Sequence, residues 1–358
     1  MSRQQGQAGI AGSEPIVAVH DLAKTFTLKR RFGQPPRLLR AVRGVSFEIA
    51  RGETLGLVGE SGSGKSTLGR MLVGLIPPTS GTVRLFGETL TDPRAGDTFS
   101  RLRSRVQFVF QDPQSSLNPR MRIGDAIAEP IDVVGELSRH DRHRRVEELL
   151  DIVGLPRSCG ERFPHEFSGG QRQRIGIARA LALNPEFIVC DEPVSALDVS
   201  LQAQVVNLLL DLQQAFGLSY LFIAHDLAVV RNISDRVAVM YAGEIVETAP
   251  RDALYAEPAH PYTRTLLDAV PRPDPRRRLV ASVRGELPSL VNPPQGCTFA
   301  PRCPHAMERC RVEPPLPRVV GPGRQVACHL FSEDPAAIAQ ATIPISPAAP
   351  GSPSPANA

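Results

Sequence analysis

Five short runs of uninterrupted apolar residues lie along the chain, and each predicts a strand that is buried on both faces. They occupy residues 54–58, 106–110, 187–190, 220–224 and 237–240. Stretches with apolar positions at helical spacing lie between them, for example residues 140–155 and 200–217. Because strands and helices alternate, the pattern predicts an α/β fold with a parallel sheet covered by helices.

The pattern changes toward both ends of the chain. Residues 16–28 and 41–50 alternate apolar and polar positions more regularly, which predicts an antiparallel addition to the sheet. Residues 1–14 are expected to be flexible. Prolines crowd together from about residue 270, and the Pro/Ala/Ser-rich residues 332–358 lack core-forming side chains, which predicts a disordered tail.

Composition narrows the class of protein. Hydrophobic residues make up 42% of the chain and charged residues 22%, and the net charge is only +4. These values are typical of a globular protein and do not indicate a basic nucleic-acid binder. No apolar run approaches the roughly 18 residues that span a bilayer, and residues 1–15 lack the apolar core of a secretory signal. A cytosolic location is therefore expected, where clustered cysteines suggest metal rather than disulfides.

The sequence GESGSGKS follows the first predicted buried strand and precedes a predicted helix. It fits a phosphate-binding loop, in which glycines let successive backbone N–H groups point at phosphate oxygens, although a glycine-rich turn that only starts a helix is the plainer alternative. Lys65 is expected to reach the β- and γ-phosphates, and the Ser66 hydroxyl to ligate Mg²⁺. The predicted ATP contacts here are Gly59, Glu60, Ser61, Gly62, Ser63, Gly64, Lys65, Ser66 and Thr67.

Polar residues follow three other predicted strands, at the edge of the sheet where ligands bind. Asp191 is suited to hold Mg²⁺, mostly through water, and Glu192 to polarise an attacking water as general base; two carboxylates that cap the next helix are the alternative. His225 is either structural or catalytic, and the Gln111 amide could sense Mg²⁺ or the lytic water. Farther upstream, Phe26 could stack on adenine or be a core aromatic.

The sequence FSGGQRQR at residues 167–174 predicts the start of a helix. Ser168 is a good N-cap, and the apolar positions that follow have helical spacing. Such a helix start offers unpaired N–H groups and a dipole that suit an anion. Because no aromatic residue lies between the two arginines to stack on a base, a nucleic-acid site is not favoured.

In this order, the motifs resemble the nucleotide-binding subunit of an ABC transporter, over about residues 16–271. GESGSGKS matches the Walker A loop, FIVCDE the Walker B strand and FSGGQ the signature motif, with Phe167 in place of the usual leucine. Gln111 matches the Q-loop, His225 the switch histidine and Phe26 the adenine-stacking aromatic. The resemblance implies a P-loop NTPase (RecA-like) core with an antiparallel β subdomain and a helical subdomain at about residues 112–180, together forming a nucleotide-binding domain at residues 15–271.

The resemblance also implies a catalytic site that two subunits share. The residues that would complete the ATP site of the other subunit are Ser168, Gly169, Gly170, Gln171 and the D-loop residue Asp198. Two ATP molecules would draw the subunits together, and hydrolysis would let them part. The implied partners are a second homologous ATPase or a second copy of this chain, two transmembrane permease subunits and, indirectly, an extracytoplasmic solute-binding protein. This places the chain on the cytoplasmic face of the membrane and gives it no nucleic-acid partner.

Two further segments resemble the ATPases of dipeptide and oligopeptide importers: PAHPYTRTLLDAVP at residues 258–271 and the cysteine-rich extension at residues 272–331. Importers of nickel and other small solutes share this extension, so they remain the alternative. The extension has too few apolar residues to bury a core, and a metal crosslink would explain its order. Four thiolates suit an iron–sulfur cluster, and the resemblance favours the 4Fe–4S type. Zinc is the alternative, with His305 or His329 as substitute ligands; the four cysteines are Cys297, Cys303, Cys310 and Cys328.

An ABC-type ATPase that acts on nucleic acid without a membrane is the competing class. ABC-type translation factors carry two ATPase domains in one chain, whereas this chain has one. DNA-repair members insert long coiled coils or zinc modules inside the ATPase, and the sequence shows neither. Transport is therefore the favoured function.

Overall fold

The computed structural model describes residues 14–28, 36–90, 101–112, 116–135, 137–269 and 288–331. The expectations of a flexible N-terminus and of a disordered tail concern residues that lie outside these ranges, apart from residue 14.

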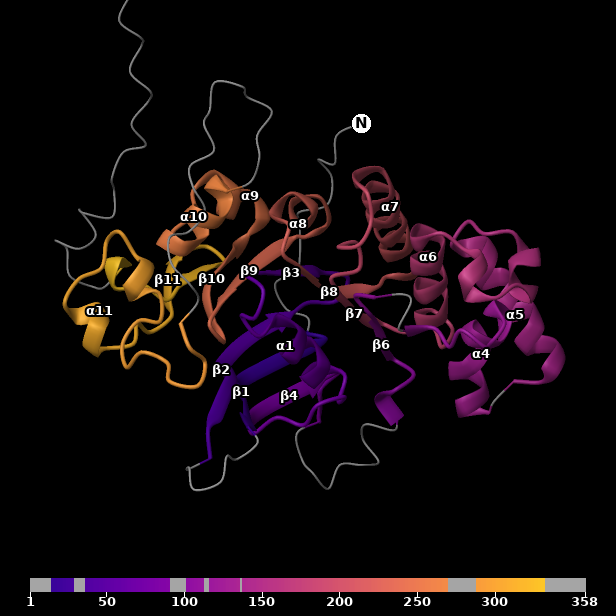
Figure 1. Ribbon diagram of the computed structural model, residues 1–358, viewed down its shortest axis with the longest axis horizontal. Helices are drawn as coiled ribbons and strands as arrows, with labels where there is room; N and C mark the ends of the chain where they lie inside the picture. The colour runs from indigo at the N-terminus through magenta and orange to yellow at the C-terminus, as the bar shows by residue number, and fades with distance from the viewer. Residues whose placement is uncertain are drawn as a thin grey trace, which may run out of the picture.

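An eight-stranded sheet runs through the molecule in the order β11-β12-β10-β9-β3-β8-β7-β6 (Figure 1). The five strands from β9 to β6 are parallel to one another, and each coincides with one of the apolar runs. The predicted parallel sheet is therefore confirmed. The five strands are β3 (Thr54–Val58), β6 (Val106–Val109), β7 (Phe187–Asp191), β8 (Ser219–Ala224) and β9 (Arg236–Tyr241).

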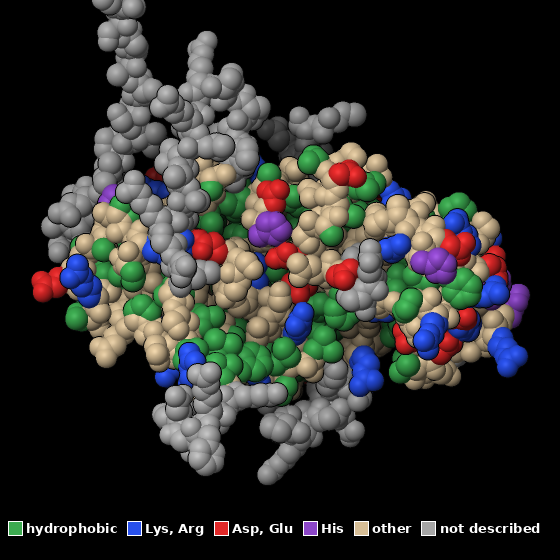
Figure 2. All heavy atoms as spheres, in the orientation of Figure 1, with side chains coloured by type: hydrophobic (Ala, Val, Ile, Leu, Met, Phe, Trp, Pro, Cys, Tyr) green, Lys and Arg blue, Asp and Glu red, His purple; other side chains and the backbone are tan. Residues whose placement is uncertain are grey.

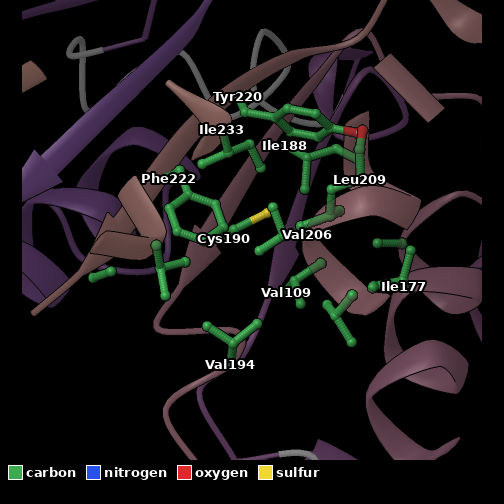
Figure 3. Close-up of a cluster of buried hydrophobic side chains, with 14 of the residues drawn as sticks. Val109, Ile177, Ile188, Cys190, Val194, Val206, Leu209, Tyr220, Phe222 and Ile233 are labelled. Atoms are coloured by element: carbon green, nitrogen blue, oxygen red, sulfur yellow. The ribbon is translucent and has the colours of Figure 1, made fainter. Parts of the chain in front are cut away.

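Both faces of this sheet are buried, as the uninterrupted apolar runs require. Ile188 and Cys190 of β7 belong to one hydrophobic core, whereas the alternate residues Phe187 and Val189 belong to the core on the opposite face. Figure 3 shows the first core, in which side chains from three helices surround Cys190. These helices are α6 (Gly169–Ala180), α7 (Val199–Phe216) and α8 (Leu227–Ile233).

A second, antiparallel sheet covers the other face together with α1 (Lys65–Leu72) (Figure 1). Its strand order is β2-β1-β4-β5. Residues that point inward from β1 and β2 share a core with Leu55 and Leu57 of β3, which explains the alternating pattern at the start of the chain. The strands are β1 (Val17–Thr27), β2 (Leu38–Ile49), β4 (Ser80–Leu85) and β5 (Glu88–Thr89).

A helical lobe occupies one end of the molecule, where α4 (Ile123–Val134) and α5 (Arg139–Ile152) pack with α6 (Figure 1). Ser138 begins α5 as its N-cap and accepts a hydrogen bond from the backbone N–H of Asp141. On the face of this lobe seen in Figure 2, acidic and basic side chains are interspersed. Arg142, for example, donates hydrogen bonds to both Asp125 and Asp132.

The end of the molecule opposite the helical lobe is formed by the last described residues, 288–331 (Figure 1). Here β12 (Arg324–Val326) pairs with β10 (Glu244–Pro250), and β11 (Arg318–Gly321) forms the edge of the main sheet. The remaining helices are short: α9 (Arg251–Ala256), α10 (Pro261–Asp268) and α11 (Arg309–Val312). Within the described ranges, no helix has the length and apolar character needed to cross a membrane.

Candidate functional site

The loop between β3 and α1 has the curled backbone that its glycines predict. Gly62 has φ 80° and Gly64 has φ 105°, in the left-handed region that glycine tolerates best. A β carbon at Gly64 would also collide with the backbone carbonyl oxygen of Ala41. The loop therefore requires glycine at this position, and α1 begins directly after it with Lys65.

Lys65 is buried at the base of this loop, with 4% of its surface exposed. Its Nζ donates hydrogen bonds to the carbonyl oxygens of Gly59 at 2.8 Å and Glu60 at 3.0 Å. Burial lowers the pKa of Lys65, while the nearby carboxylates of Glu192 and Asp191 act to raise it. The ammonium group is thus held beside the loop by carbonyl dipoles and by two acidic neighbours.

Asp191 at the end of β7 meets Ser66 in the first turn of α1, although β8 lies between β7 and β3 in the sheet. The Ser66 Oγ donates a hydrogen bond to Oδ1 of Asp191 at 2.8 Å. Asp191 is 1% exposed, and this burial raises the pKa of its carboxyl group, partly offset by the hydrogen bond from Ser66. Two oxygen groups of the kind that Mg²⁺ prefers therefore lie together.

Glu192 lies at the centre of a second polar cluster. Its Oε2 accepts a hydrogen bond from Nε2 of Gln111 at 3.1 Å and lies 3.2 Å from Nδ1 of His225. Glu192 has φ 46°, a left-handed conformation that is uncommon outside glycine and that is often found at functional sites. Its backbone N–H donates to the carbonyl of Ile223 in β8, which fixes this turn of the chain.

One cavity of about 530 Å³ is lined by residues of the phosphate loop and by the Glu192 cluster, but not by Asp191. Most of the residues that sequence reasoning selected for ATP and catalysis line it, including Phe26 at one wall. Sequence reasoning missed Leu39, Ala41 and Leu290. Leu290 lies in the extension at residues 272–331, whose resemblance to the importer ATPases gives no sign of a nucleotide contact. The lining residues are Phe26, Leu39, Ala41, Ser61, Gly62, Gly64, Lys65, Ser66, Thr67, Gln111, Glu192, His225 and Leu290.

The signature residues do not line this cavity. Ser168 begins α6 as predicted, and its Oγ accepts a hydrogen bond from the backbone N–H of Gln171 at 3.3 Å. The Gln171 side chain accepts one in return from the backbone N–H of Ser168, which completes a capping box. Ser168, Gly169 and Gln171 are exposed. The start of α6 is therefore open to solvent and does not contribute to the cavity of its own chain.

Asp198 lies beside the signature helix and not in the cavity. It is the N-cap of α7 and accepts a hydrogen bond from the backbone N–H of Leu201 at 2.9 Å. This hydrogen bond, together with one from Ser200, lowers the pKa of Asp198. Leu197 and Leu201 flank Asp198 and pack near the glycines that start α6. The D-loop and the signature residues thus form one continuous surface.

The four cysteines of residues 288–331 share one neighbourhood. Burial raises the pKa of Cys297 to about 11 and that of Cys328 to about 12, and proximity to the other thiols adds to both shifts. Backbone N–H groups two residues farther along the chain hydrogen-bond to the sulfurs of Cys297, Cys303 and Cys328. Across the described ranges, however, no group of three or more His, Cys, Asp or Glu side chains has the geometry to hold a metal ion. The expected metal cluster is therefore not shown.

The two candidate substitute ligands, His305 and His329, have different hydrogen-bond partners. The Nε2 atom of His329 lies 2.9 Å from the carbonyl oxygen of Glu313, so this nitrogen carries its proton and donates to the backbone. His305 is half-buried and donates its backbone N–H to the Cys303 sulfur. The other two cysteines, Cys159 and Cys190, are buried elsewhere in the chain.

Comparison with known proteins agrees with this geometry. The sequence profile of the ABC transporter family matches residues 42–195, and that of the oligopeptide/dipeptide transporter C-terminal region matches residues 246–310. The dimeric structure of the cassette MJ0796 in a post-hydrolysis state with ADP and phosphate is similar, with a TM-score of 0.59 and 29% identity. That match covers 66% of this chain and 98% of the solved one.

Similarity to whole sequences extends further along the chain. A Brucella abortus protein named as a peptide import ATP-binding protein is 64% identical over 89% of this chain and 95% of its own length. A Bacillus subtilis protein named as an oligopeptide transport ATP-binding protein is 52% identical, over 88% of this chain and 96% of its own length. The phosphate loop, the carboxylate cluster and these relatives together show that the chain belongs to the ABC transporter family, as an ATPase of the peptide and oligopeptide importer type.

Proposed function

We propose that this chain binds and hydrolyses ATP at the 530 Å³ cavity, and that the resulting closure of a dimer powers the import of small peptides. The observation that carries the proposal is the convergence of Gln111 and His225 on one oxygen of Glu192, beside the phosphate loop. A purely structural role for the ends of these three strands would not require a carboxylate, an amide and an imidazole to meet there.

ATP binding follows from the loop and from Lys65. Phosphate oxygens would accept hydrogen bonds from the loop N–H groups, and the N-terminus of α1 adds its partial positive charge. The Lys65 ammonium now donates to carbonyls of the same loop, so it lies within reach of the β- and γ-phosphates. Adenine would stack on Phe26, which lines the same cavity and is half-buried.

Mg²⁺ fits the oxygen groups of Ser66, which lines the cavity, and of Asp191, to which Ser66 is hydrogen-bonded. Ser66 would ligate the ion directly, and Asp191 would hold it mostly through water, because the two side chains are already within hydrogen-bonding distance. The bound ion would neutralise charge on the phosphates. Gln111 is suited to contact the ion or the water beside it, because its amide points to Glu192 at the same place.

Catalysis is assigned to Glu192 as the general base for the attacking water. His225 and Gln111 position its carboxylate, and the strained backbone at Glu192 keeps the carboxylate directed into the cavity. The test is a Glu192→Gln variant, which keeps the shape of the side chain but cannot accept a proton. ATP turnover should be lost while ATP binding persists; turnover near wild type would refute the assignment.

We infer that the second half of each site comes from another subunit. The surface formed by Ser168, Gly169, Gly170, Gln171 and Asp198 lies outside the cavity of its own chain, and the similar MJ0796 cassette is dimeric. Either a homologous ATPase or a second copy of this chain would supply it. Two permease subunits at the cytoplasmic face of a membrane, served by an extracytoplasmic solute-binding protein, would turn closure into transport.

Peptides are the favoured solute because the named relatives with high identity are peptide and oligopeptide proteins. Nickel or another small solute is the alternative. A role on nucleic acid is not favoured, since the face of the helical lobe seen in Figure 2 mixes both signs of charge instead of forming a basic patch. Co-purification with permease subunits and ATPase assays with candidate solutes would decide between these.

We propose further that Cys297, Cys303, Cys310 and Cys328 hold a 4Fe–4S cluster, with zinc as the alternative. The support is their shared neighbourhood and the N–H groups directed at three of the sulfurs, which favour thiolates. Their sulfurs are not spaced for a metal in this structure, so binding would require them to shift. Anaerobically purified protein should absorb broadly in the visible range and contain about four irons; colourless protein with one zinc would reverse the choice.

A further inference from the structure

An ion pair between Glu60 and Arg302 joins the phosphate loop to the C-terminal segment at residues 288–331. The two terminal nitrogens of Arg302 donate to the two carboxylate oxygens of Glu60, at 3.0 and 2.9 Å. The Arg302 side chain is 5% exposed and that of Glu60 25%. A two-point pair of this kind fixes direction as well as distance, so it constrains the loop more tightly than a single contact.

The remaining polar groups of Glu60 are held as well. Its backbone N–H donates to the hydroxyl of Tyr262 at 2.9 Å, and its carbonyl accepts from Lys65 at 3.0 Å. Arg302 also donates to the hydroxyl of Tyr241 at 3.2 Å. Glu60 of the phosphate loop is thus hydrogen-bonded to α10 and to the C-terminal segment, and through Arg302 it is connected to the end of β9.

Aromatic side chains pack around this junction. The Phe299 ring lies 5.2 Å from that of Tyr241 and 5.4 Å from that of Tyr262, measured between centroids. Phe299 and Arg302 both lie between Cys297 and Cys303 in the sequence. Cys303 directly follows Arg302, so the backbone that carries the guanidinium group also carries one of the four cysteines.

We propose that Arg302 is a positioning residue of the ATP site: it holds Glu60, and through Glu60 the phosphate loop, in the shape that binds phosphate. The cysteine-bearing segment 297–310 then sets the affinity for ATP, although its sulfurs lie outside the nucleotide cavity. The inference rests on the proposed ATP-binding function. A loop that is already held in place loses less conformational entropy when it binds a ligand, which is the physical source of the effect.

The Glu60→Ala variant distinguishes a positioning role of the pair from a purely electrostatic one, because the two predict opposite changes in ATP binding. If Glu60 and Arg302 acted only through their charges, Glu60→Ala would remove a negative group near the phosphates and strengthen ATP binding. If the pair positions the loop, Arg302→Ala and Glu60→Ala both weaken it. We expect each to raise the Kd about 10-fold, which corresponds to about 1.4 kcal/mol.

The experiment measures the Kd of a fluorescent ATP analogue with Mg²⁺ on the full-length chain. The double variant Glu60→Ala/Arg302→Ala should bind no more weakly than either single variant, because both remove the same interaction. The matched control is Arg309→Ala, which breaks the exposed Arg309–Glu313 pair of the same segment and should leave the Kd unchanged. Opposite shifts in the single variants, or multiplied effects in the double variant, would overturn the proposal.

The binding measurements distinguish a folding defect, and a failure of the proposed ATP-binding function, from a failure of the role of Arg302. If Arg302→Ala does not fold, Glu60→Ala carries the test alone: weaker binding supports the proposal, and unchanged or tighter binding overturns it. Wild-type protein that binds no ATP would refute the proposed function itself. Wild-type binding that both variants retain in full would refute only the role of Arg302.

A separate experiment tests the link between the cysteines and ATP binding. Cys303→Ser should weaken ATP binding several-fold in the wild-type chain and have no further effect in the Glu60→Ala background. An equal effect in both backgrounds would show that the segment acts on the nucleotide by another route. In the assembled transporter, Arg302→Ala should raise the KM for ATP more than it lowers kcat, because the residue acts on binding and not on the attacking water.

Discussion

The phosphate-loop side and the signature side of the ATP machinery are built in different ways. On the loop side, polar groups from four strand ends converge inside one chain, so that Ser66 meets Asp191 and Glu192 meets both Gln111 and His225. On the signature side, Ser168 and Gln171 are exposed, and the side chain of each accepts a hydrogen bond from the backbone N–H of the other. The loop side of the ATP site is assembled within one chain, whereas the signature residues lie outside that cavity.

The difference follows from where each half lies in the fold. The loop side lies at the carboxyl edge of a parallel sheet, where neighbouring strands bring distant residues together. The signature side belongs to the helical lobe, and its capping box satisfies the Ser168 and Gln171 backbone N–H groups without a partner. A helix start that is stable in solvent can remain free until a second subunit brings ATP to it.

The largest expected effect is on the loop side. Glu192→Gln should lower ATP turnover of the assembled complex by about 10³-fold, because the general base is lost while the loop contacts remain. Lys65→Ala should lose ATP binding as well. Single-turnover assays and equilibrium binding on the same preparations separate the two outcomes, and a Glu192→Gln enzyme that turns over normally would remove Glu192 from the mechanism.

The signature side should respond differently. Ser168→Ala removes the N-cap of α6, and we expect turnover of the complex to fall about 10-fold while ATP binding by the isolated chain stays unchanged. Ser138→Ala is the matched control, since it removes the N-cap of α5 in the same lobe. Equal losses of turnover and of isolated-chain binding after Ser168→Ala would contradict a site shared between subunits.

A smaller effect is expected at the adenine end of the cavity. Phe26→Ala should raise the Kd for ATP about 5-fold, the size that the loss of one aromatic stacking contact produces. Phe216→Ala is the control, because Phe216 is half exposed at the end of α7 and does not line the cavity. An unchanged Kd would assign Phe26 to the core of the β subdomain instead.

The smallest expected effect concerns stability. Burial raises the pKa of Asp191 above its ordinary value of 3.8, so the folded chain binds this proton more tightly than the unfolded chain does. The stabilisation that the protonated Asp191 carboxyl provides is therefore present at acid pH and is lost as the pH rises through the raised pKa. Without nucleotide, Asp191→Asn should raise the Tm by about 2 °C at neutral pH.

Thermal unfolding at several pH values tests this prediction. The Tm advantage of Asp191→Asn should shrink toward acid pH, where the wild-type carboxyl is protonated. An advantage that is independent of pH, or a lower Tm at neutral pH, would contradict a buried and destabilising carboxylate. Saturating Mg²⁺ and ATP should stabilise the wild type more than the variant, because the ion needs the charged oxygen.

The amino-acid sequence by itself determined the elements and the motifs. Apolar runs identify buried strands because both faces of a parallel sheet lie against helices or a second sheet, and β3 matches its predicted bounds. Gly64 and Ser168 were predictable because a left-handed turn and a helix N-cap depend on local chemistry. Residues at strand ends could be assigned to one edge of the sheet from topology alone.

Only the tertiary structure decided which side chains meet. The Arg302–Glu60 pair joins residues 242 positions apart, and no local pattern marks either partner for the other. Leu290 reaches the ATP cavity because its carbonyl accepts a hydrogen bond from the backbone of Arg40 in β2, a contact between segments far apart in the chain. The left-handed turn at Glu192 likewise depends on its bond to β8. Local chemistry sets helices, strands and caps, whereas contacts between distant segments exist only once the packed core has brought those segments together.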